Sequence, residues 1–500
     1  MIKSECNFNR IVPIHYYMEN HATTWNWDHS YIRLNKLLFS EVTPTPVPQP
    51  ELLVYNSKLA SELGIKQTID ESLLAQLAGN LMNEGIHPIA QAYAGHQFGH
   101  FNILGDGRAI LLGEHLTPTN ERFDIQLKGP GRTPYSRNGD GRATMSAMLR
   151  EYLISEAMHG FGIPTTRSLA VIATGEEVYR EYVSEGAVLT RIATSHIRVG
   201  TFQYAAKYLP KEELREFCDY VIQRHYPEVA NDTNPPLAFL KKVQEKQIDL
   251  IVNWMRVGFI HGVMNTDNMS IPGETIDYGP CAFMNAYHPS TVFSSIDRNG
   301  RYAFGNQPSI AQWNSACLAS ALIPIIHEDK EEAVKLCQTV INEFPVIYEQ
   351  RWAKMMCSKL GILEEQAADD LLIKELLTWM EENQADYTNT FLQLTKSSED
   401  HTGIYSSNEF QTWFNLWKKR VADYLTEDVH ALLKSTNPTY IPRNHLVEEA
   451  LHNATHLNDF ELFHKLLEIF ENPYSKQIGK EQFQEGPIHG DEGYQTFCGT

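Results

Sequence analysis

The chain has 500 residues, 42% of them hydrophobic, and its 42 lysines and arginines against 62 aspartates and glutamates give a net charge of −20. This composition excludes disordered, fibrous and collagen-like proteins, and the length predicts about two to four domain-sized units. The acidity also disfavours non-specific nucleic-acid binding, which requires lysines and arginines to neutralise phosphates.

The first 84 residues predict an N-terminal extension. Its opening, MIKSECNFNRIVPIHYY, lacks the basic segment followed by an apolar one that marks a signal peptide. The proline-rich VTPTPVPQP, residues 42–50, predicts an extended connector. The next segment, ELLVYNSKLASELGI at residues 51–65, predicts an amphipathic helix that ends at Gly64.

Short apolar segments separated by glycines predict a largely antiparallel sheet between about residues 85 and 190. Its strands are expected at residues 109–114, 123–129, 168–174 and 186–193. One helix is expected among them, at residues 144–159, because apolar residues recur there at helical spacing until Gly160.

Helices dominate the pattern from about residue 205. One is predicted around residues 241–260, before a loop rich in glycine and asparagine at 261–280, and another at 331–344, with further helices to about residue 470. No apolar run reaches about 18 residues, the length that a membrane-spanning helix needs. We therefore expect a cytoplasmic protein with neither a membrane nor a nucleic-acid partner.

Cysteine and histidine spacing indicates neither a disulfide scaffold nor a structural zinc site. The seven cysteines are thinly spread and include no Cys-x-x-Cys pair. His96 and His100 could serve a metal if they lay on a helix. The glycines at 95 and 99 favour a loop instead, so packing or turn histidines are the simpler interpretation.

Arginines are concentrated in the middle of the chain. Residues 128–198 contain nine basic and seven acidic residues, whereas the rest of the chain is strongly acidic. Because the guanidinium fork matches phosphate oxygens, this stretch could bind a small polyanionic ligand. An ordinary mixed surface is the alternative.

Three features in this region could form a nucleotide site. Gly105 and Gly107 form a Gly-x-Gly turn that would let the backbone approach phosphates, although a lone motif of this kind is more often a hairpin turn. Lys128 ends a predicted strand, and Glu151 follows on the predicted helix; such a lysine–glutamate pair orients ATP phosphates in kinase-like folds. An exposed strand end and a solvated helix face are the alternatives for these two residues.

The most informative segment is HGVMNTDN, residues 261–268, followed by Asp277 in Asp-Tyr-Gly. Asn268 and Asp277 carry hard oxygen ligands suited to Mg²⁺, and Asp-Tyr-Gly resembles the Asp-Phe-Gly metal loop of kinases. Val263 occupies the place of the aspartate that activates the hydroxyl in small-molecule kinases. Asp267 is the nearby carboxylate that could replace it as base.

The sequence contains neither the phosphate-binding motif of P-loop NTPases nor the Gly-x-Ser-x-Gly elbow of α/β-hydrolases. What remains is a kinase-like nucleotide site that has many arginines and lacks the usual aspartate as catalytic base.

At the level of long motifs the chain resembles the selenoprotein O family of protein adenylyltransferases, which have a pseudokinase-like fold and transfer AMP rather than phosphate. The resemblance runs through most of the chain. It is carried by four segments in order: QAYAGHQFGHFNILGDGRAILLGE, DIQLKGPGRTPYSRNGDGRA, LTRIATSHIRVGTFQ and HGVMNTDNMSIPGETIDYGP.

The resemblance implies that ATP binds flipped relative to ordinary kinases, so that its α-phosphate faces the acceptor hydroxyl. It also assigns nucleotide-binding roles to a set of residues in the first three motifs: Gly105, Gly107 and Arg108 in the nucleotide loop, Lys128 on phosphate with Glu151 orienting it, Asp140 and Gly141 on the nucleotide, and Arg191 and Arg198 on its terminal phosphate.

For the fourth motif the resemblance implies that Asn268 and Asp277 bind Mg²⁺, with Mn²⁺ as the alternative, and that Asp267 accepts the proton. Acceptors would be Ser, Thr or Tyr hydroxyls of proteins, the chain itself among them. A phosphotransferase with a displaced base and an inactive ATP-binding scaffold are the competing functions. Val263 argues against the former, and retention of the metal pair argues against the latter.

Many eukaryotic members of this family carry selenocysteine near the C-terminus, where this chain has Cys498. Cys281 directly follows the Asp-Tyr-Gly-Pro segment. We hypothesise that these two cysteines form a reversible, regulatory disulfide, with two unrelated thiols as the alternative.

The predicted fold is therefore α+β, a protein-kinase-like two-lobed core with an N-terminal extension and a helical C-terminal region. The predicted parts are the extension at 1–84, the N-lobe at 85–185, the C-lobe with the metal site at 186–330, and the helical region and tail at 331–500.

Overall fold

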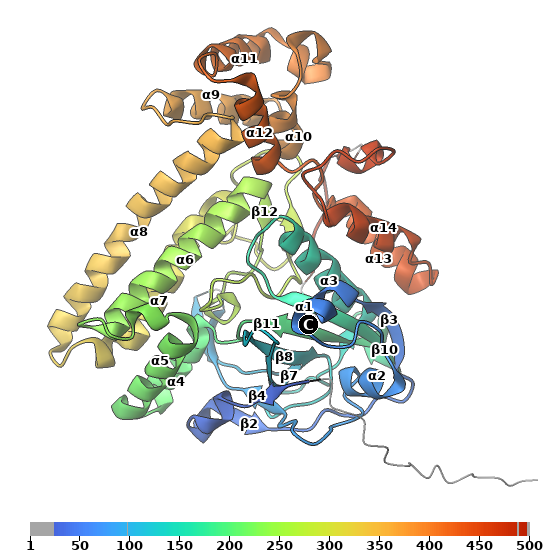
Figure 1. Cartoon of the computed structure of the whole chain (residues 1–500), viewed down its shortest axis with the longest axis vertical. Coiled ribbons are helices and arrows are strands. Elements are labelled where there is room, and N and C mark those ends of the chain that lie inside the picture. The colour runs from blue at the N-terminus through green and yellow to red at the C-terminus, as the bar shows by residue number, and fades with distance from the viewer. Residues whose placement is uncertain (1–24, 98, 488–489, 498–500) are drawn as a thin grey trace, which may run out of the picture.

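The computed structural model describes residues 25–97, 99–487 and 490–497 of the chain (Figure 1). In this part of the chain a large sheet lies beside a mainly helical part, which confirms the α+β class expected from the sequence. The strands are β1 Trp27–Asp28, β2 Phe39–Glu41, β3 Glu51–Tyr55, β4 Ile89–Gln91, β5 Ala94–Gln97, β6 His100–Ile103, β7 Ala109–Leu116, β8 Arg122–Lys128, β9 Ala143–Thr144, β10 Arg167–Tyr179, β11 Val183–Ala193, β12 Phe259–Ile260 and β13 Ala282–Phe283.

The helices fill most of the chain after β11 (Figure 1). They are α1 Ser57–Leu63, α2 Glu71–Leu77, α3 Met145–Gly160, α4 Val199–Tyr208, α5 Lys211–His225, α6 Pro235–Val257, α7 Gln307–Ile326, α8 Lys330–Lys359, α9 Asp369–Glu382, α10 Tyr387–Gln393, α11 Asn408–Arg420, α12 Thr426–Thr436, α13 Asn444–His456 and α14 Glu461–Phe470.

The main sheet of the described residues is antiparallel throughout, as predicted. Its strands run in the order β2-β4-β7-β8-β11-β10-β3, with β1 added beside β7 and β9 beside β11. The four strands predicted from the sequence are its central strands β7, β8, β10 and β11. Strands β5 and β6 form a separate hairpin.

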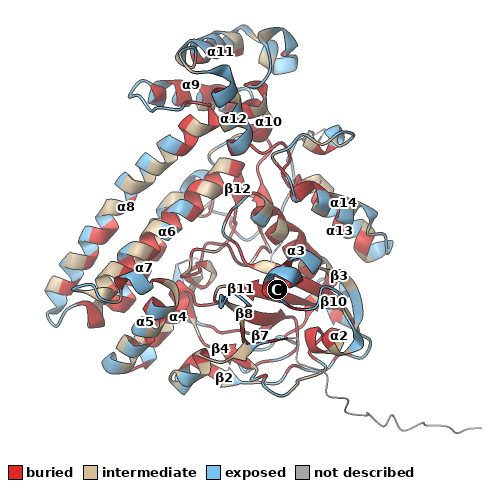
Figure 2. Ribbon diagram, viewed as in Figure 1, coloured by how far each residue is buried: buried red, intermediate tan, exposed pale blue. Residues whose placement is uncertain are grey.

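Both faces of the main sheet are covered by helices. Alternate residues of a strand point to opposite faces, so neighbouring residues of β7 show what packs on each face. Ile110 and Leu112 of β7 belong to the buried cluster that contains α1 and α2 side chains. Leu111, between them, belongs to the cluster that contains the α3 side chains. The sheet is thus packed between α3 on one face and α1 with α2 on the other, and its core is buried (Figure 2).

The helix predicted for residues 51–65 is wrong in its first half. Residues Glu51–Tyr55 form β3, which pairs with β10, and only Ser57–Leu63 are helical. The side chain of Asn56 accepts a hydrogen bond from the amide of Leu59 and starts the helix there. Gly64 ends it as predicted, in the left-handed conformation at φ 73°.

Two predicted domain boundaries pass through the main sheet. Strands β1 to β3 come from the predicted N-terminal extension, and β11 crosses the boundary between residues 185 and 186. The sheet forms because segments distant in sequence share one hydrogen-bonded ladder. The four-part division of the chain stays a prediction.

Helices α6, α7 and α8 pack side by side and form the body of the helical part (Figure 1). One segment, Phe304–Ile326, is long and apolar enough to cross a membrane, but 61% of its apolar window is buried inside the protein. This segment includes α7, which packs mainly against α4, α6 and α8. Its apolar composition is therefore accounted for by its place in the core.

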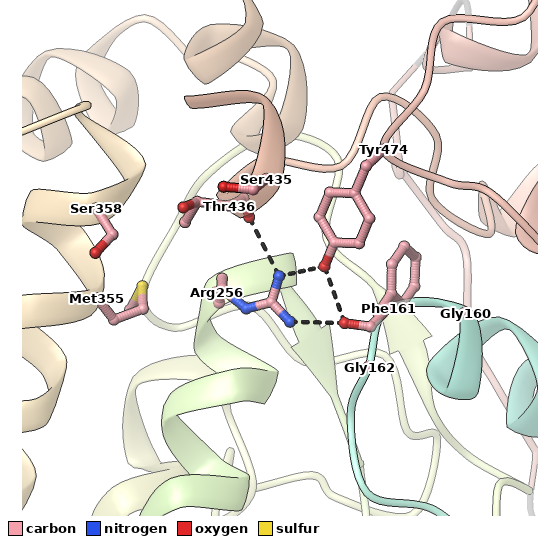
Figure 3. A pocket seen from close by; sticks show the side chains of 9 residues that line it. All are labelled: Gly160, Phe161, Gly162, Arg256, Met355, Ser358, Ser435, Thr436 and Tyr474. Carbon is pink, nitrogen blue, oxygen red and sulfur yellow. Dashed lines mark hydrogen bonds between the residues drawn. The ribbon is translucent and has the colours of Figure 1, made fainter. Parts of the chain in front are cut away.

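Arg256, near the end of α6, joins the C-terminal region to the core (Figure 3). Its guanidinium donates to the carbonyl of Phe161 at 3.0 Å, to the carbonyl of Thr436 at 3.2 Å and to the hydroxyl of Tyr474. The Tyr474 hydroxyl also donates to Phe161 at 2.9 Å. These bonds give the guanidinium donors acceptors at the wall of a cavity of about 460 Å³. They also fix three segments that are distant in the sequence to one another.

Candidate functional site

A cleft of about 790 Å³ lies between the sheet and the helical part. It is lined by the loop before β7, the loop 135–142, the end of β8, helix α3, strand β11 and the loop 263–280. The predicted site residues other than the two cysteines all line it: Gly105, Gly107, Arg108, Lys128, Asp140, Gly141, Glu151, Arg191, Arg198, Asp267, Asn268 and Asp277. The structure thus brings these residues together, and the individual roles assigned to them stay predictions.

Lys128 lies at the centre of the cleft wall, where β8 ends. Its Nζ donates to Oε2 of Glu151 on α3 at 2.5 Å and to Oδ1 of Asp277 at 2.7 Å. Both lysine and glutamate are buried, so neither is the exposed group that the alternative interpretations required. Ion pairs thus join the strand lysine to the helix glutamate and to the loop aspartate, and a strand lysine paired with a helix glutamate also occurs in kinase-like folds.

Arg191 of β11 joins the same network and is 1% exposed. Its Nη1 donates to Glu151 at 3.1 Å and to Asp277 at 3.0 Å. Burial by itself would raise the pKa of the Asp277 carboxyl, but the charges of Lys128 and Arg191 outweigh it and hold that pKa well below its usual range. Asp277 is therefore an anion in a strongly cationic setting.

Gln126 and Asp106 complete the arginine network, and the sequence reasoning missed both. Oε1 of Gln126 accepts from Nε and Nη2 of Arg191 at 3.2 and 2.6 Å, and its Nε2 donates to Oδ2 of Asp106 at 3.3 Å. The other oxygen of Asp106 lies 3.8 Å from the guanidinium of Arg198. That guanidinium stacks over Tyr93, 4.4 Å from the ring centre. One glutamine and one aspartate thus link the two arginines.

A sequence signal for Gln126 exists in the strand itself. Asp124, Gln126 and Lys128 alternate with Ile125 and Leu127, so the polar residues share one face of β8 and the apolar residues the other. All five are buried, and the polar face is the one that meets the cleft network.

The glycine turn at 105–107 is not a hairpin, which corrects that alternative. It joins β6 to β7, and these strands belong to different sheets. Gly105 has φ 152°, and a Cβ there would overlap the ring of Tyr135. The hydroxyl of Ser136 donates to the carbonyl of Gly107 at 2.5 Å. Close packing under loop 135–142 therefore requires these glycines.

Asp140 and Gly141 lie in that overlying loop. The Asp140 carboxylate accepts two bonds from Arg180, at 2.8 and 2.9 Å, and this pairing lowers its pKa to about 2. Gly141 has φ 71°, and a Cβ there would overlap the carbonyl of Gly131. Asp140 therefore presents an arginine-paired carboxylate to the cleft.

Asn268 and Asp277 offer oxygen ligands from two neighbouring loops. The Asn268 amide nitrogen donates to the carbonyl of Val263 at 3.0 Å, which fixes the direction of the amide oxygen. Asp277 has φ 64°, a left-handed conformation that sets the carboxylate toward Lys128. No cluster of three His, Cys, Asp or Glu side chains occurs among the described residues. A site with one carboxylate, one amide and phosphate oxygens fits the way proteins bind Mg²⁺.

Asp267 lies on the same wall, in the short turn before Asn268. Burial raises the pKa of its carboxyl to about 6, and its Oδ1 is buried with no hydrogen-bond partner among the described residues. A Cβ on Gly95 would overlap that oxygen, so β5 approaches the carboxylate closely. Val263, the residue at the position of the usual kinase base, is buried and apolar. Asp267 thus lines the cleft with a carboxylate of raised pKa, one oxygen of which is buried against β5.

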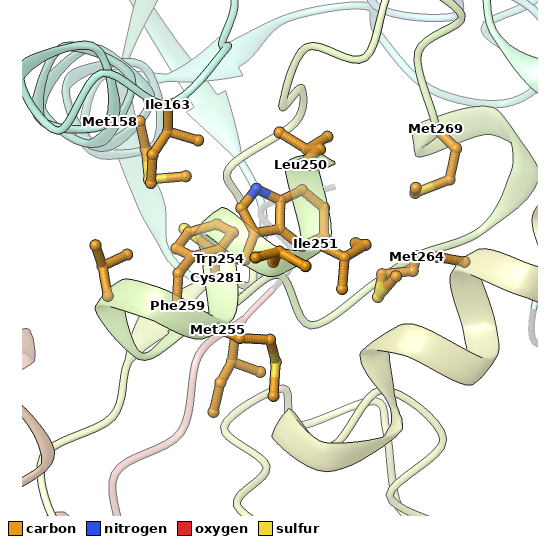
Figure 4. Close-up of a cluster of buried hydrophobic side chains, with 14 of the residues drawn as sticks. Met158, Ile163, Leu250, Ile251, Trp254, Met255, Phe259, Met264, Met269 and Cys281 are labelled. Carbon is orange, nitrogen blue, oxygen red and sulfur yellow. The ribbon is translucent and has the colours of Figure 1, made fainter. Parts of the chain in front are cut away.

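Cys281 lies outside the cleft lining, in the buried cluster around Trp254 (Figure 4). Its thiol donates to the carbonyl of Tyr278 at 3.1 Å, and burial raises its pKa to about 12. Cys498 lies outside the described residues, so the predicted disulfide stays a prediction. The tail does reach this loop, because the hydroxyl of Thr496 donates to the carbonyl of Pro280 at 2.7 Å.

Comparisons with known proteins place this site in a family. The sequence profile of "Protein adenylyltransferase SelO" matches residues 22–471. Proteins named "Protein nucleotidyltransferase YdiU" from Bacillus cereus and Bacillus anthracis are each 53% identical over 486 residues, which cover 96% of this chain and 100% of the relative.

A solved structure of ROP2 from Toxoplasma gondii, described as a virulence factor with a protein-kinase fold and no enzymatic activity, matches 67% of this chain and 87% of its own. Its identity is 10% and its TM-score 0.23. The sequence matches alone confirm the resemblance: the chain belongs to the SelO family of protein adenylyltransferases and is a protein nucleotidyltransferase.

Proposed function

We propose that this enzyme transfers AMP from metal-bound ATP to Ser, Thr or Tyr hydroxyls of proteins, the chain itself among them. The single observation that supports this best is the cleft network in which Lys128 and Arg191 converge on Asp277 and Glu151. Fixed cations around a phosphate site stabilise the charge that develops in phosphoryl and nucleotidyl transfer.

In the proposed reaction the acceptor oxygen attacks the α-phosphorus of ATP. A new bond forms between that oxygen and phosphorus, the bond from the α-phosphorus to the bridging oxygen breaks, and diphosphate leaves. The Asp267 carboxylate, which lines the cleft and has a pKa of about 6, takes the proton of the hydroxyl. Lys128, Arg191 and Arg198 hold the phosphates.

Asn268 and Asp277 would hold Mg²⁺, or Mn²⁺ in its place. The ion would neutralise phosphate charge and polarise the phosphorus–oxygen bonds. Glu151 keeps Lys128 and Arg191 oriented, since it accepts from both. The glycines at 105 and 107 keep the loop under Tyr135 and Ser136 closely packed.

We also propose a cytoplasmic location without nucleic-acid or membrane partners. The five cysteines in the described part of the chain are free thiols, as is usual in a reducing compartment. The net charge of −20 would repel nucleic acids and anionic lipid surfaces.

The test uses purified, reduced protein with Mg²⁺ and ATP labelled in either the α- or the γ-phosphate, followed by electrophoresis. Protein-bound α-label that is lost in Asp277→Ala is the expected result. Protein-bound γ-label alone would instead show a phosphotransferase. Asp267→Ala should abolish transfer while ATP binding stays close to wild type, and loss of both would contradict its role as base.

A further inference from the structure

A second groove, of about 680 Å³, adjoins the nucleotide cleft. It lies between the loop at residues 296–301 and the first turn of α7. Ile296 lines both hollows and is 45% exposed. The groove and the cleft therefore meet at this residue, so a chain bound in the groove can reach the nucleotide.

Two arginines give the groove its charge. Arg298 is exposed at its edge. The Arg301 guanidinium stacks 4.8 Å from the ring centre of Trp313 and 5.7 Å from that of Tyr302, which holds it in one place. The carboxylate of Asp297 turns inward, since it accepts from the backbone amides of Arg301 and Tyr302 at 2.9 and 2.7 Å.

The wall of the groove is tied to the loop that carries the predicted base. The buried Tyr302 hydroxyl donates to Oδ1 of Asn265 at 2.5 Å. Asn265 lines the nucleotide cleft two residues before Asp267. A ligand that contacts Arg301 is therefore bound next to the segment that would activate its hydroxyl.

We propose that this groove binds an extended acidic segment of the acceptor protein and so delivers the neighbouring hydroxyl to the cleft. The proposal rests on the proposed function and names the substrate feature that it recognises. Arginine forks pair with carboxylates, and Asn306 and Ser309, at the start of α7, add polar groups to the same wall. The chain as a whole has a net charge of −20 and repels an acidic partner, so these two cations select where it docks.

The test is fluorescence anisotropy with the full chain and two labelled peptides. Each has one tyrosine, flanked by glutamates in the first and by lysines in the second. We expect the acidic peptide to bind at least tenfold more tightly than the basic one. Arg298→Glu should weaken the acidic peptide at least tenfold, and Arg301→Lys should weaken it to a lesser degree.

The matched control is Lys396→Glu, which makes the same charge change at an exposed position just beyond α10. It should leave peptide binding within twofold of wild type. Equal binding of the two peptides, binding of neither, or equal weakening by Arg298→Glu and Lys396→Glu would each overturn the proposal.

The outcome is separable from that of the proposed function. Wild-type protein is incubated in parallel with α-labelled ATP. Protein-bound label without any preference for the acidic peptide would refute the groove alone. Selective peptide binding without label in any protein would support the groove and refute AMP transfer.

Discussion

Replacement of Gln126 by leucine tests whether the arginines of the cleft act as one positioned group. Gln126 is 0% exposed and gives Arg191 two hydrogen bonds through one oxygen, at 2.6 and 3.2 Å. The substitution removes both, together with the bond to Asp106. Arg191 keeps its bonds to Glu151 and Asp277, so its charge stays in the cleft while its orientation is released.

The size of the effect follows from the bonds lost. A buried hydrogen bond to a charged group contributes about 1.5–3 kcal/mol. Because the two bonds share one acceptor, their loss should cost about 2–3 kcal/mol of interaction free energy. At about 1.4 kcal/mol per factor of ten, kcat/KM for ATP should fall roughly 30- to 140-fold. Gln126→Glu keeps an acceptor for Arg191 but replaces the donor to Asp106 with a second carboxylate, whose repulsion should cancel part of that benefit.

The assay is transfer of α-label from ATP to protein, with ATP affinity measured separately by calorimetry. Gln244→Leu is the control, because Gln244 is equally buried in α6 and donates to the carbonyl of Val340 at 2.8 Å, away from the cleft. It should alter thermal stability but not kcat/KM. A folded Gln126→Leu protein that keeps kcat/KM within threefold of wild type would refute the reasoning.

Three further outcomes are expected. Burial raises the pKa of the Glu274 carboxyl from 4.5 to about 8, although hydrogen bonds from Thr194 oppose this shift. The folded protein therefore loses stability as pH rises from about 4.5 to 8. In calorimetry, Glu274→Gln should raise the melting temperature at pH 8 and not at pH 4. Gly95→Ala should abolish label transfer, since its methyl group would displace Asp267. The predicted disulfide requires that mild oxidation with oxidised glutathione link the Cys281 and Cys498 peptides in mass mapping, and unchanged reactivity of both thiols, which the burial of Cys281 favours, would contradict it.

The parts of the site that the sequence could predict are those that local pattern encodes. Lys128 ends a strand with alternating polar and apolar residues, and Glu151 lies on a helix with clear apolar spacing. Because kinase-like folds have a strand lysine followed by a helix glutamate, the pairing of these two residues could be inferred from the sequence. The contact between Arg191 and Asp277 could not, because 86 residues separate them and a strand meets a loop. Only the folded chain shows that this arginine shares a carboxylate with Lys128.

The errors arose where tertiary pairing decides the structure. The segment at 51–55 is short and apolar, and such runs fit a helix or a strand equally; its pairing with β10 decides for the strand. The turn at Gly105 fits a hairpin locally, but β6 pairs with β5 rather than β7. Neither partner can be read from the segment itself.

The charge balance of the ion-pair network around Lys128, apart from the other arginines that line the cleft, predicts that ATP needs a metal ion here. Three cations, Lys128, Arg191 and Arg198, face three carboxylates, those of Glu151, Asp277 and Asp106. The formal charges of these six groups sum to zero, so the network has no net positive charge with which to bind a polyphosphate.

A divalent ion would supply that positive charge and would occupy the carboxylate that Lys128 and Arg191 now share. We therefore expect chelation with EDTA to abolish label transfer and to weaken ATP binding at least tenfold, with Mg²⁺ restoring both. In Asp277→Asn the same chelation should change ATP binding much less, because the acidic ligand is gone while the cations remain. Equal ATP affinity of the wild type with EDTA and with Mg²⁺ would show that the arginines alone hold the phosphates.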